Sequence, residues 1–281
     1  MKEEKEKIAI LGCGWLGLLL AKSLLSKGYE VKGSTTSESK LNVLKNAGIS
    51  PFQIQLEAHK IIGTIEDFLK ETDVLVIDIP PGLRRAISSS QEMTFVNKIK
   101  ILIPFIEKSG IQKVIFVSST SVYSDSFPIV EITEETKPNP DTESGKQLVI
   151  AESLLQSNSH FKTIIIRFGG LLGDDRHPIK FLAGRTNVEN PNAPVNMIER
   201  EDCIGIIEKV LDFARDANWE WNQTFNAVAP QHPSRTAYYH KKAELFHLPL
   251  PTFVENLASK GKIISSKKVE TILGYSFQKE I

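Results

Sequence analysis

The N-terminal thirty residues constrain the fold more than any other part of the sequence. A continuous apolar run, Ile8 to Leu11, is typical of a strand buried on both faces. It leads into Gly12-Cys13-Gly14-Trp15-Leu16-Gly17, after which a helical pattern runs to Gly28. Glycines in this context allow a tight turn and let backbone N–H groups approach a pyrophosphate at the helix N-terminus. The segment predicts a dinucleotide-binding loop, the alternative being a tight turn without a ligand. The predicted cofactor-binding residues are Gly12, Gly14, Trp15, Leu16 and Gly17.

Strand and helix patterns alternate along the rest of the chain. The predicted strands cover 30–34, 52–56, 74–79, 114–117, 163–167 and 225–229. The predicted helices cover 38–47, a segment capped by Thr64, 90–108 with an interruption at Pro104, 143–156, 200–215 and 234–247. This alternation predicts an α/β fold, a Rossmann-like doubly wound parallel sheet with a small C-terminal substrate lobe.

The pattern loosens after Arg167, which suggests where the lobe begins. We assign residues 1–168 to an NAD(P)-binding Rossmann domain and residues 169–281 to a mixed α/β substrate lobe, some of whose elements complete the main sheet. Open α/β sheets bind ligands at the carboxyl ends of their strands. Pro80, in the loop after the strand at 74–79, is therefore added to the predicted cofactor site.

Four hydroxyl side chains mark the end of the second predicted strand. The sequence there is Gly33-Ser34-Thr35-Thr36-Ser37, where an acidic residue would bind the 2′-hydroxyl of NAD. Hydroxyl groups can donate hydrogen bonds to a 2′-phosphate, whereas an aspartate would repel it. We therefore expect Ser34, Thr35 and Thr36 to bind the cofactor and to favour NADP over NAD. Lys40 is the nearest cation, and Ser37 has the alternative role of a helix N-cap.

Composition excludes several classes of partner. The 281-residue chain has a formal net charge of zero at pH 7, which argues against nucleic acid or an anionic membrane as the main partner. No stretch resembles a membrane span, and the charged run Met1 to Lys7 differs from a signal peptide. The two cysteines are expected to be buried and reduced, so we predict a cytoplasmic protein. Six scattered histidines predict no metal site.

Several later segments, taken in order, resemble the extended short-chain dehydrogenase/reductase superfamily. Residues 117–123, Val-Ser-Ser-Thr-Ser-Val-Tyr, are similar to its Ser-Ser-x-x-Val-Tyr signature, and Asn139-Pro140 precedes Lys146. Residues 167–173 are similar to its Arg-x-x-x-x-x-Gly turn, and residues 195–202 to its Val-Asn-x-Ile-x-x-x-Asp segment. The compact GxGxxG loop and the Gly-x-x-Arg-His-Pro segment further resemble an atypical branch, the NAD(P)-dependent epimerase/dehydratase-like proteins.

The resemblance implies a reaction and reveals one departure from the family. Relatives carry Tyr-x-x-x-Lys, in which the lysine contacts the nicotinamide ribose and lowers the pKa of a tyrosine that acts as acid or base. Here the segment reads Thr142-Glu143-Ser144-Gly145-Lys146, so Thr142 replaces the tyrosine. A threonine hydroxyl is far less acidic than a phenol and cannot exchange protons near neutral pH. The replacement should silence the ordinary reaction or require a surrogate group.

The resemblance also assigns candidate catalytic residues. Ser119 corresponds to the hydroxyl that binds the reacting oxygen. Lys146 corresponds to the catalytic lysine, which also contacts the cofactor ribose. Tyr123 and Glu143 are the nearest surrogates in the sequence, and Tyr123 is taken as the third catalytic candidate. Tyr123 has the alternative role of a packed aromatic, and Glu143 that of a first-turn residue at a helix N-terminus. Asp202 is expected to be a structural anchor at a helix start.

The predicted lid carries a cluster of positive charge. Arg176, His177, Lys180 and Arg185 suit a phosphate or carboxylate ligand, although a basic run on a loop can also be solvated surface. Asn196 completes the predicted substrate site, so the predicted site residues are Arg176, His177, Lys180 and Asn196. The predicted partner is a small anionic molecule, and the oligomeric state is left open.

Three functional hypotheses follow. The first is an oxidoreductase or nucleotide-sugar epimerase/dehydratase-like protein that uses NADP or NAD. The alternative is a non-catalytic NAD(P)-binding sensor, because the cofactor loop is kept while the acid/base residue is lost. A hydroxyacid-dehydrogenase-type enzyme is disfavoured, since its second domain would be largely helical and the strands predicted at 163–167 and 225–229 contradict that.

Overall fold

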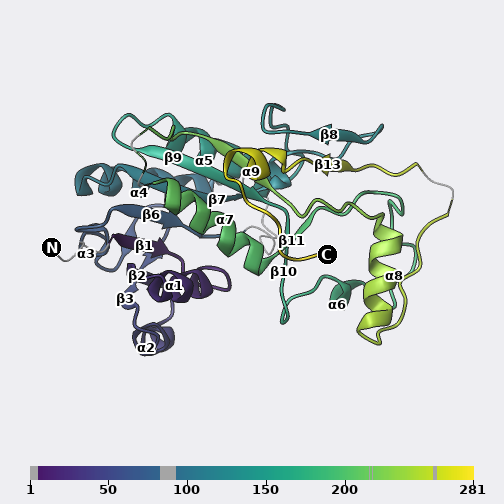
Figure 1. The fold of residues 1–281 in the computed structure, drawn as a ribbon, viewed down its shortest axis with the longest axis horizontal. Helices are drawn as coiled ribbons and strands as arrows, with labels where there is room; N and C mark the ends of the chain where they lie inside the picture. The colour runs from purple at the N-terminus through teal and green to yellow at the C-terminus, as the bar shows by residue number, and fades with distance from the viewer. Residues whose placement is uncertain (1–5, 83–92, 215, 217, 256–257) are drawn as a thin grey trace. The chain divides into compact units, whose positions relative to one another are not determined.

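The fold is built on a seven-stranded sheet with the strand order β12-β9-β7-β6-β1-β2-β3 (Figure 1). The computed structural model describes residues 6–82, 93–214, 216, 218–255 and 258–281. The sheet strands are β1 (Lys7–Leu11), β2 (Glu30–Thr35), β3 (Ser50–Gln53), β6 (Val74–Ile77), β7 (Lys113–Ser119), β9 (Lys162–Phe168) and β12 (Thr224–Ala227). The pairs from β7 across to β3 are all parallel. The predicted Rossmann-like, doubly wound α/β fold is confirmed.

The two central strands explain why this sheet forms. Every residue of β6 is buried, as are four of the five residues of β1. Strands that helices cover on both faces read as continuous apolar runs, and these two pair in register from Ile8 with Val74 to Leu11 with Ile77. Both strands therefore bring their carboxyl ends, and the loops that follow, to the same edge of the sheet.

The predicted helices are present with different ends, and the helices at Ile179–Leu182 and Lys267–Ile272 were not predicted. The observed helices are α1 (Gly17–Ser26), α2 (Leu41–Asn46), α3 (Ile65–Leu69), α4 (Thr94–Ser109), α5 (Glu143–Gln156), α6 (Ile179–Leu182), α7 (Arg200–Phe213), α8 (Arg235–Leu245) and α9 (Lys267–Ile272). Short 3₁₀ turns cover Glu38–Lys40 and Thr120–Val122. The predicted start of α4, residues 90–92, lies outside the described residues.

Two local predictions were wrong. Pro104 lies inside α4 without ending it, although proline has no N–H to donate to the carbonyl of Lys100. Thr64 occupies the N-cap position of α3, but its side chain makes no capping hydrogen bond.

The strand predicted at 52–56 divides in two. Ile54 still donates its N–H to Thr35 O at 3.0 Å, after which the chain leaves the main sheet. It then forms a small antiparallel pair of β4 (Gln55–Leu56) and β5 (Ile61–Ile62).

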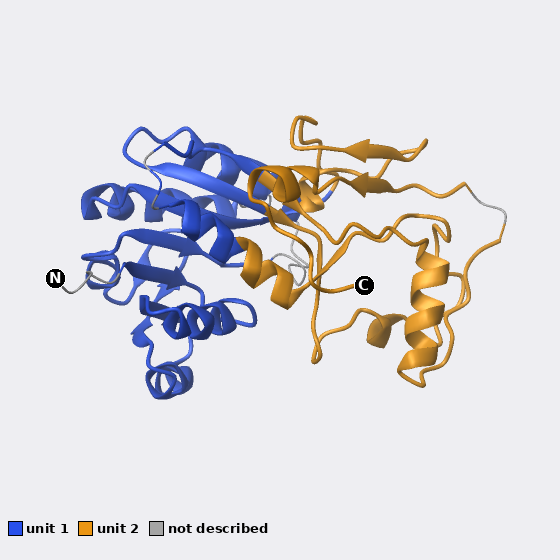
Figure 2. Cartoon of the chain, viewed as in Figure 1, with its two compact units in different colours: residues 1–119, 142–166, 207–224 blue, residues 120–141, 167–206, 225–281 orange. Residues whose placement is uncertain are grey.

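The chain divides into two compact units, each made of several segments (Figure 2). Unit 1 contains residues 1–119, 142–166 and 207–224. Unit 2 contains residues 120–141, 167–206 and 225–281. Residues 120–141 belong to unit 2 and residues 207–224 to unit 1, and the division into an NAD(P)-binding domain over 1–168 and a substrate lobe over 169–281 stays a prediction.

Unit 2 has its own small strands and its own core. Its parallel pairs are β8 (Val130–Ile132) with β13 (Lys262–Ile264), and β10 (Gly170–Leu172) with β11 (Met197–Glu199). Sequence periodicity did not predict these strands, because each has only three residues. Its buried core cluster comprises Leu172, Ile179, Val195, Ala229, Tyr238, Tyr239, Ala243 and Ile281.

Candidate functional site

The three glycines of the loop between β1 and α1 have different structural roles. Gly12 has a φ of +111°, and a Cβ there would lie 2.2 Å from the carbonyl oxygen of Asp78. A Cβ on Gly17 would lie 2.3 Å from the carbonyl oxygen of Gly12. A Cβ on Gly14, in contrast, would meet no atom within 4 Å. Gly12 and Gly17 are therefore required by packing, whereas Gly14 is exposed and leaves its side of the loop open to a ligand.

Hydrogen bonds hold this loop against β2. Gly12 N donates to Ser34 Oγ at 2.9 Å, Cys13 N donates to Ser34 O at 2.7 Å, and Gly14 N donates to Gly12 O at 2.7 Å. Ser34 is only 2% exposed, so its hydroxyl supports the loop from the buried side by accepting the Gly12 N–H. Ser34 is predicted from the sequence to bind the cofactor, whereas its hydroxyl and carbonyl oxygens accept hydrogen bonds from the loop.

The first turn of α1 provides a positive helix end. Leu16 occupies its N-cap position without a side-chain cap, and the first turn contains no acidic residue. The first N–H groups of a helix lack intrahelical partners and carry partial positive charge, which favours an anion. Leu16 has a buried side chain and Trp15 a half-buried one, so Leu16 has only its backbone to offer a ligand.

The hydroxyl groups after β2 are only partly accessible. Thr35 is buried, and its Oγ1 accepts a hydrogen bond from Ser37 N at 3.2 Å. Thr36 is exposed, and the hydroxyls of Ser37 and Ser39 lie 2.8 Å apart. Of the predicted Ser34, Thr35 and Thr36, only Thr36 has an exposed side chain. Ser39, which was not among the predicted residues, adds a second exposed hydroxyl side chain beside Thr36.

Asp78 is the second residue at this site that the sequence reasoning missed. It follows β6 directly, and its carboxyl accepts a hydrogen bond from the backbone N–H of Gly17. Burial raises the pKa of this carboxyl from 3.8 to about 7, although the Gly17 hydrogen bond partly opposes the shift. Pro80, two residues later, is exposed.

The segment from Thr142 to Lys146 forms the start of α5 in unit 1. Thr142 is the N-cap residue, and its Oγ1 accepts a hydrogen bond from Gly145 N at 3.1 Å. Glu143 accepts from the side chain of Gln147 at 2.9 Å, within the first turn. Lys146 is exposed on the same turn, and Ser119 is half-buried at the carboxyl end of β7, against which α5 packs. Unit 1 thus contains both Ser119 and Lys146, with a helix-capping threonine at the tyrosine position.

Tyr123 lies in unit 2 and is a packed aromatic. The side chain is 1% exposed, its ring faces the guanidinium of Arg167 at 5.1 Å, and its hydroxyl accepts a hydrogen bond from that guanidinium. The hydroxyl also lies within hydrogen-bond distance of Thr133 O at 3.2 Å and Asn226 Oδ1 at 3.3 Å. Burial raises the pKa of Tyr123 despite the nearby cation. These contacts give the phenol a structural role and make it a poor surrogate acid.

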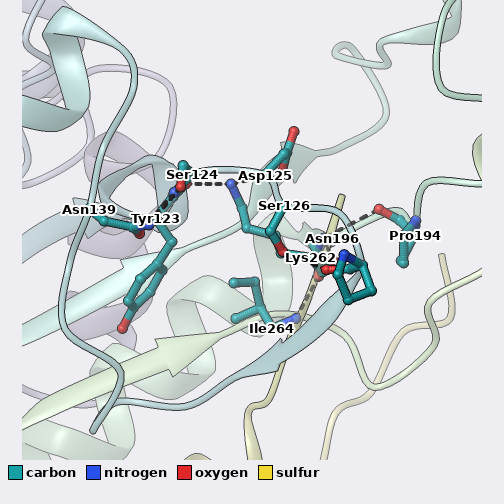
Figure 3. Close-up of polar contacts among 10 residues, drawn as sticks. Tyr123, Ser124, Asp125, Ser126, Asn139, Pro194, Asn196, Lys262 and Ile264 are labelled. Atoms are coloured by element: carbon teal, nitrogen blue, oxygen red, sulfur yellow. Dashed lines mark hydrogen bonds and ion pairs between the residues drawn. The ribbon is translucent and has the colours of Figure 1, made fainter. Parts of the chain in front are cut away.

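The backbone around Tyr123 is fastened to β13 (Figure 3). Lys262 donates from Nζ to Tyr123 O at 2.5 Å and forms an ion pair with Asp125 at 3.2 Å. Asn196 donates to Lys262 O at 2.8 Å and accepts from Ile264 N at 2.9 Å. The Asn196 amide therefore ties the segment before β11 to β13. Its predicted substrate contact would require it to exchange these bonds.

His177 is a core residue of unit 2. The side chain is 5% exposed, and Nδ1 accepts a hydrogen bond from Ile179 N at 3.2 Å. Nε2 therefore carries the proton of the neutral ring and faces the hydroxyl of Tyr238 at 3.0 Å. Burial, reinforced by the charges of Lys242 and Lys180, lowers the pKa of His177 to about 4. Both ring nitrogens have protein partners, so we remove His177 from the group of candidate ligand contacts.

Three cations of the predicted cluster, Arg176, Lys180 and Arg185, are exposed in unit 2. Arg176 lies in a turn in which its N and O both bond to Gly173, at 2.8 and 3.0 Å. Lys180 is exposed at the start of α6. The neighbouring Asp175 pairs with Arg200 at 3.1 Å, which helps to fix this turn.

Asp202 is a structural anchor, as expected. It is fully buried, and its carboxylate accepts hydrogen bonds from Tyr275 Oη at 2.8 Å, Gln278 N at 2.7 Å and Lys279 N at 3.2 Å. A Cβ on Gly205 would lie 2.5 Å from the Tyr275 hydroxyl, so the glycine makes room for this contact. The C-terminal segment is held to α7 in this way.

Within the described parts of the chain, no group of three or more metal-ligating side chains comes together. The helices described there are also too short or too polar to cross a bilayer.

Comparisons with known proteins agree with the geometry of the loop. A profile of the family described as NAD(P)H-binding matches residues 12–212. Protein YeeZ of Escherichia coli strain K12 is 34% identical over 275 residues, which cover 97% of this chain and 96% of YeeZ.

Solved structures share the whole fold. UDP-glucuronic acid 4-epimerase from Bacillus cereus, in complex with UDP-glucuronic acid and NAD, has a TM-score of 0.78 at 17% identity, covering 98% of this chain and 95% of the epimerase. A short-chain dehydrogenase/reductase superfamily protein from Agrobacterium tumefaciens, with bound NAD, has a TM-score of 0.74 at 17% identity, covering 98% of this chain and 93% of that protein. The chain belongs to the NAD(P)H-binding family, with the fold of NAD-dependent epimerase/dehydratase proteins of the short-chain dehydrogenase type.

Proposed function

We propose that the protein is an oxidoreductase or nucleotide-sugar epimerase/dehydratase-type enzyme that binds NADP or NAD and acts on a small anionic substrate. The observation that carries this proposal is the loop before α1. Its open side at Gly14 and the helix end without an acidic first-turn residue suit a pyrophosphate. The N-terminus of α1 would hold the pyrophosphate beside the open side of the loop.

The remaining residues of unit 1 suggest how the site would work. NADP or NAD, when bound, supplies a hydride acceptor or donor. Lys146 would bind the ribose hydroxyls beside the nicotinamide, and Ser119 would donate a hydrogen bond to the reacting oxygen of the substrate. Thr142 cannot supply or take up a proton near neutral pH. Proton transfer would therefore rely on another group or on water.

NADP is the proposed preference. The exposed hydroxyls of Thr36, Ser37 and Ser39, followed by Lys40, suit a 2′-phosphate. An aspartate in this place would bind the ribose hydroxyls of NAD and repel the phosphate.

An anionic substrate is proposed from the exposed cations of unit 2. Arg176 carries a planar guanidinium suited to a phosphate or carboxylate, and Lys180 adds a second positive charge. The Bacillus cereus relative was solved with UDP-glucuronic acid, which carries both kinds of anion. A nucleotide sugar or a related phosphorylated or carboxylated sugar is therefore the proposed substrate class.

A second candidate function is a non-catalytic NAD(P)-binding sensor. It is favoured by the capping role of Thr142 and the buried, hydrogen-bonded hydroxyl of Tyr123. Neither residue supplies an accessible phenol for proton transfer. A sensor would need no such group and would still need the cofactor loop.

Turnover distinguishes the two candidates. The protein is incubated with NADP or NAD and a panel of nucleotide sugars, sugar phosphates and sugar acids, and products are followed by NMR and by reduced-nicotinamide absorbance. An enzyme converts at least one anionic compound, and Ser119→Ala lowers that rate at least tenfold while Ser26→Ala, at the exposed end of α1, does not. Dinucleotide binding without turnover of any compound supports the sensor.

A further inference from the structure

Asp78 is held against the glycine loop by the register of the central strands. Leu11 pairs with Ile77, and the next residue, Asp78, donates its N–H to Leu11 O at 2.9 Å. The carbonyl oxygen of Asp78 in turn fills the space that a Cβ on Gly12 would occupy. The position of Asp78 beside the loop is therefore set by the sheet itself.

The carboxyl of Asp78 lies at the N-terminus of α1. It accepts the N–H of Gly17, the first residue of the helix, and its Oδ2 lies 3.0 Å from the place of a Cβ on Gly17. The first turn of α1 has no acidic residue of its own, so Asp78 supplies a carboxyl from another strand. This is the same helix end that the proposed function assigns to the pyrophosphate.

We propose that Asp78 couples dinucleotide binding to a proton: the loop binds the pyrophosphate tightly when the Asp78 carboxyl is protonated and more weakly when it is charged. This inference rests on the proposed function, because it concerns the same loop. Asp78 acts here as a positioning residue, since it works through Gly17 and through its charge.

The physical reason is that two anions compete for one helix end. A carboxylate at a helix N-terminus is stabilised by the exposed N–H groups, but a pyrophosphate placed beside it meets a like charge. A protonated carboxyl still accepts the Gly17 N–H through its carbonyl oxygen, so protonation removes the repulsion and keeps the loop in place.

The surroundings of Asp78 make the proton exchange accessible near neutral pH. Burial raises the pKa of Asp78 to about 7, and in the described part of the chain no charged side chain contributes to that shift. Among the described residues, Cys13 is the titratable side chain that interacts with it, and burial together with the charge of Asp78 raises the pKa of Cys13 to about 12. The thiol therefore stays neutral between pH 6 and 9, and the titration belongs to Asp78.

The test is isothermal calorimetry with NAD at pH 6, 7 and 8 on the wild-type protein, in buffers of different ionisation enthalpy. NAD is the probe because it lacks the 2′-phosphate of NADP, which would itself titrate near pH 6. Above pH 7 the wild-type protein should take up a fraction of a proton that approaches one on binding. The affinity should fall up to tenfold for each pH unit in that range.

Asp78→Asn is the informative variant, because its amide oxygen can accept the Gly17 N–H without ever being charged. Its NAD affinity should be the same at all three pH values and, at pH 8, higher than that of the wild type. Asp67→Asn, which removes an exposed carboxylate on α3, should keep the wild-type profile.

The outcomes separate this inference from the proposed function. NAD binding with no proton uptake, a flat wild-type profile, or equal profiles for wild type and Asp78→Asn overturns the role of Asp78 and leaves the cofactor site standing. An affinity that rises with pH also overturns it, because the charged carboxylate would then be the binding form. Proton uptake is measured on the wild type, so the inference stays testable even if Asp78→Asn folds poorly. No binding of NAD or NADP at any pH overturns both.

Discussion

Thr142 Oγ1 accepts a hydrogen bond from the backbone N–H of Gly145 at 3.1 Å, so this threonine caps the helix that carries Lys146. The threonine thus satisfies one of the unpaired N–H groups in the first turn of α5. A tyrosine in this position would lack the short hydroxyl side chain that makes this local stabilising contact.

Restoring the phenol should be detectable in both stability and activity. Thr142→Tyr removes the cap, which should lower the free energy of unfolding by about 1 kcal/mol in urea denaturation. If Ser119 and Lys146 keep the family geometry, the variant should gain or raise NADPH-dependent carbonyl reduction, with a pH dependence set by the new phenol. The reduction is followed by nicotinamide absorbance.

Thr142→Phe is the matched control, because it loses the same cap and adds the same bulk without a hydroxyl. A gain in activity that is equal in the two variants would contradict the role of the phenol. No gain in either variant, with the cofactor still bound, would mean that the site works by another mechanism or is not catalytic.

The glycine loop could be predicted from the sequence because its requirements are local. A buried strand, a loop with glycines at set positions and a helix follow one another within about twenty residues, and packing fixes Gly12 and Gly17 through neighbouring backbone. The alternation of strands and helices likewise predicted the sheet.

The roles of the polar residues could not be read in the same way, because their partners are distant in the sequence. Tyr238 bonds His177 from 61 positions away, and Lys262 bonds Asn196 from 66 positions away. In the sequence, Asp78 resembles an ordinary loop aspartate. Only the pairing of strands in the sheet brings it next to Gly12 and Gly17. Burial and pairing of this kind depend on the tertiary fold and leave no periodic signal.

Arg176→Ala should weaken the anionic ligand selectively. Losing a charge-assisted contact costs about 1.5 to 3 kcal/mol, which corresponds to a ten- to hundredfold loss of affinity. Nucleotide sugars, sugar phosphates and carboxylic acids are screened for thermal stabilisation of the cofactor-bound protein, and the hits are titrated into the variant. NADP affinity should not change.

Lys267→Ala, which removes another exposed cation of unit 2, should leave the titration unaltered. Anionic ligands that bind equally well to wild type and Arg176→Ala would assign Arg176 to solvated surface.

Asp78 should also make the fold less stable as pH rises. Between about pH 4 and pH 7 the folded protein holds a proton that the unfolded chain has released, since the folded pKa is about 7 against 3.8. The free energy of unfolding therefore falls as pH rises through that window, by as much as about 4 kcal/mol in total. Asp78→Asn does not undergo this loss. The difference between its free energy of unfolding and that of the wild type should therefore grow from near zero at pH 4 to its full value above pH 7.

Urea denaturation of both proteins at pH 4.5, 6 and 8 measures that difference, and other titrating groups cancel in the comparison. A difference that is constant with pH would show that Asp78 does not titrate in this range.

The most direct test of the cofactor site is calorimetric titration of NADP and NAD into the wild type, Gly14→Ala and Gly14→Asp. A Cβ at Gly14 has open space, so both variants should unfold at the wild-type urea midpoint. The wild type should bind both dinucleotides, NADP more tightly. Gly14→Ala should retain at least part of that affinity, and Gly14→Asp should lose it, because its carboxylate would face the pyrophosphate. No binding to the wild type at millimolar cofactor, or equal binding by Gly14→Asp, would show that this loop is not a dinucleotide site.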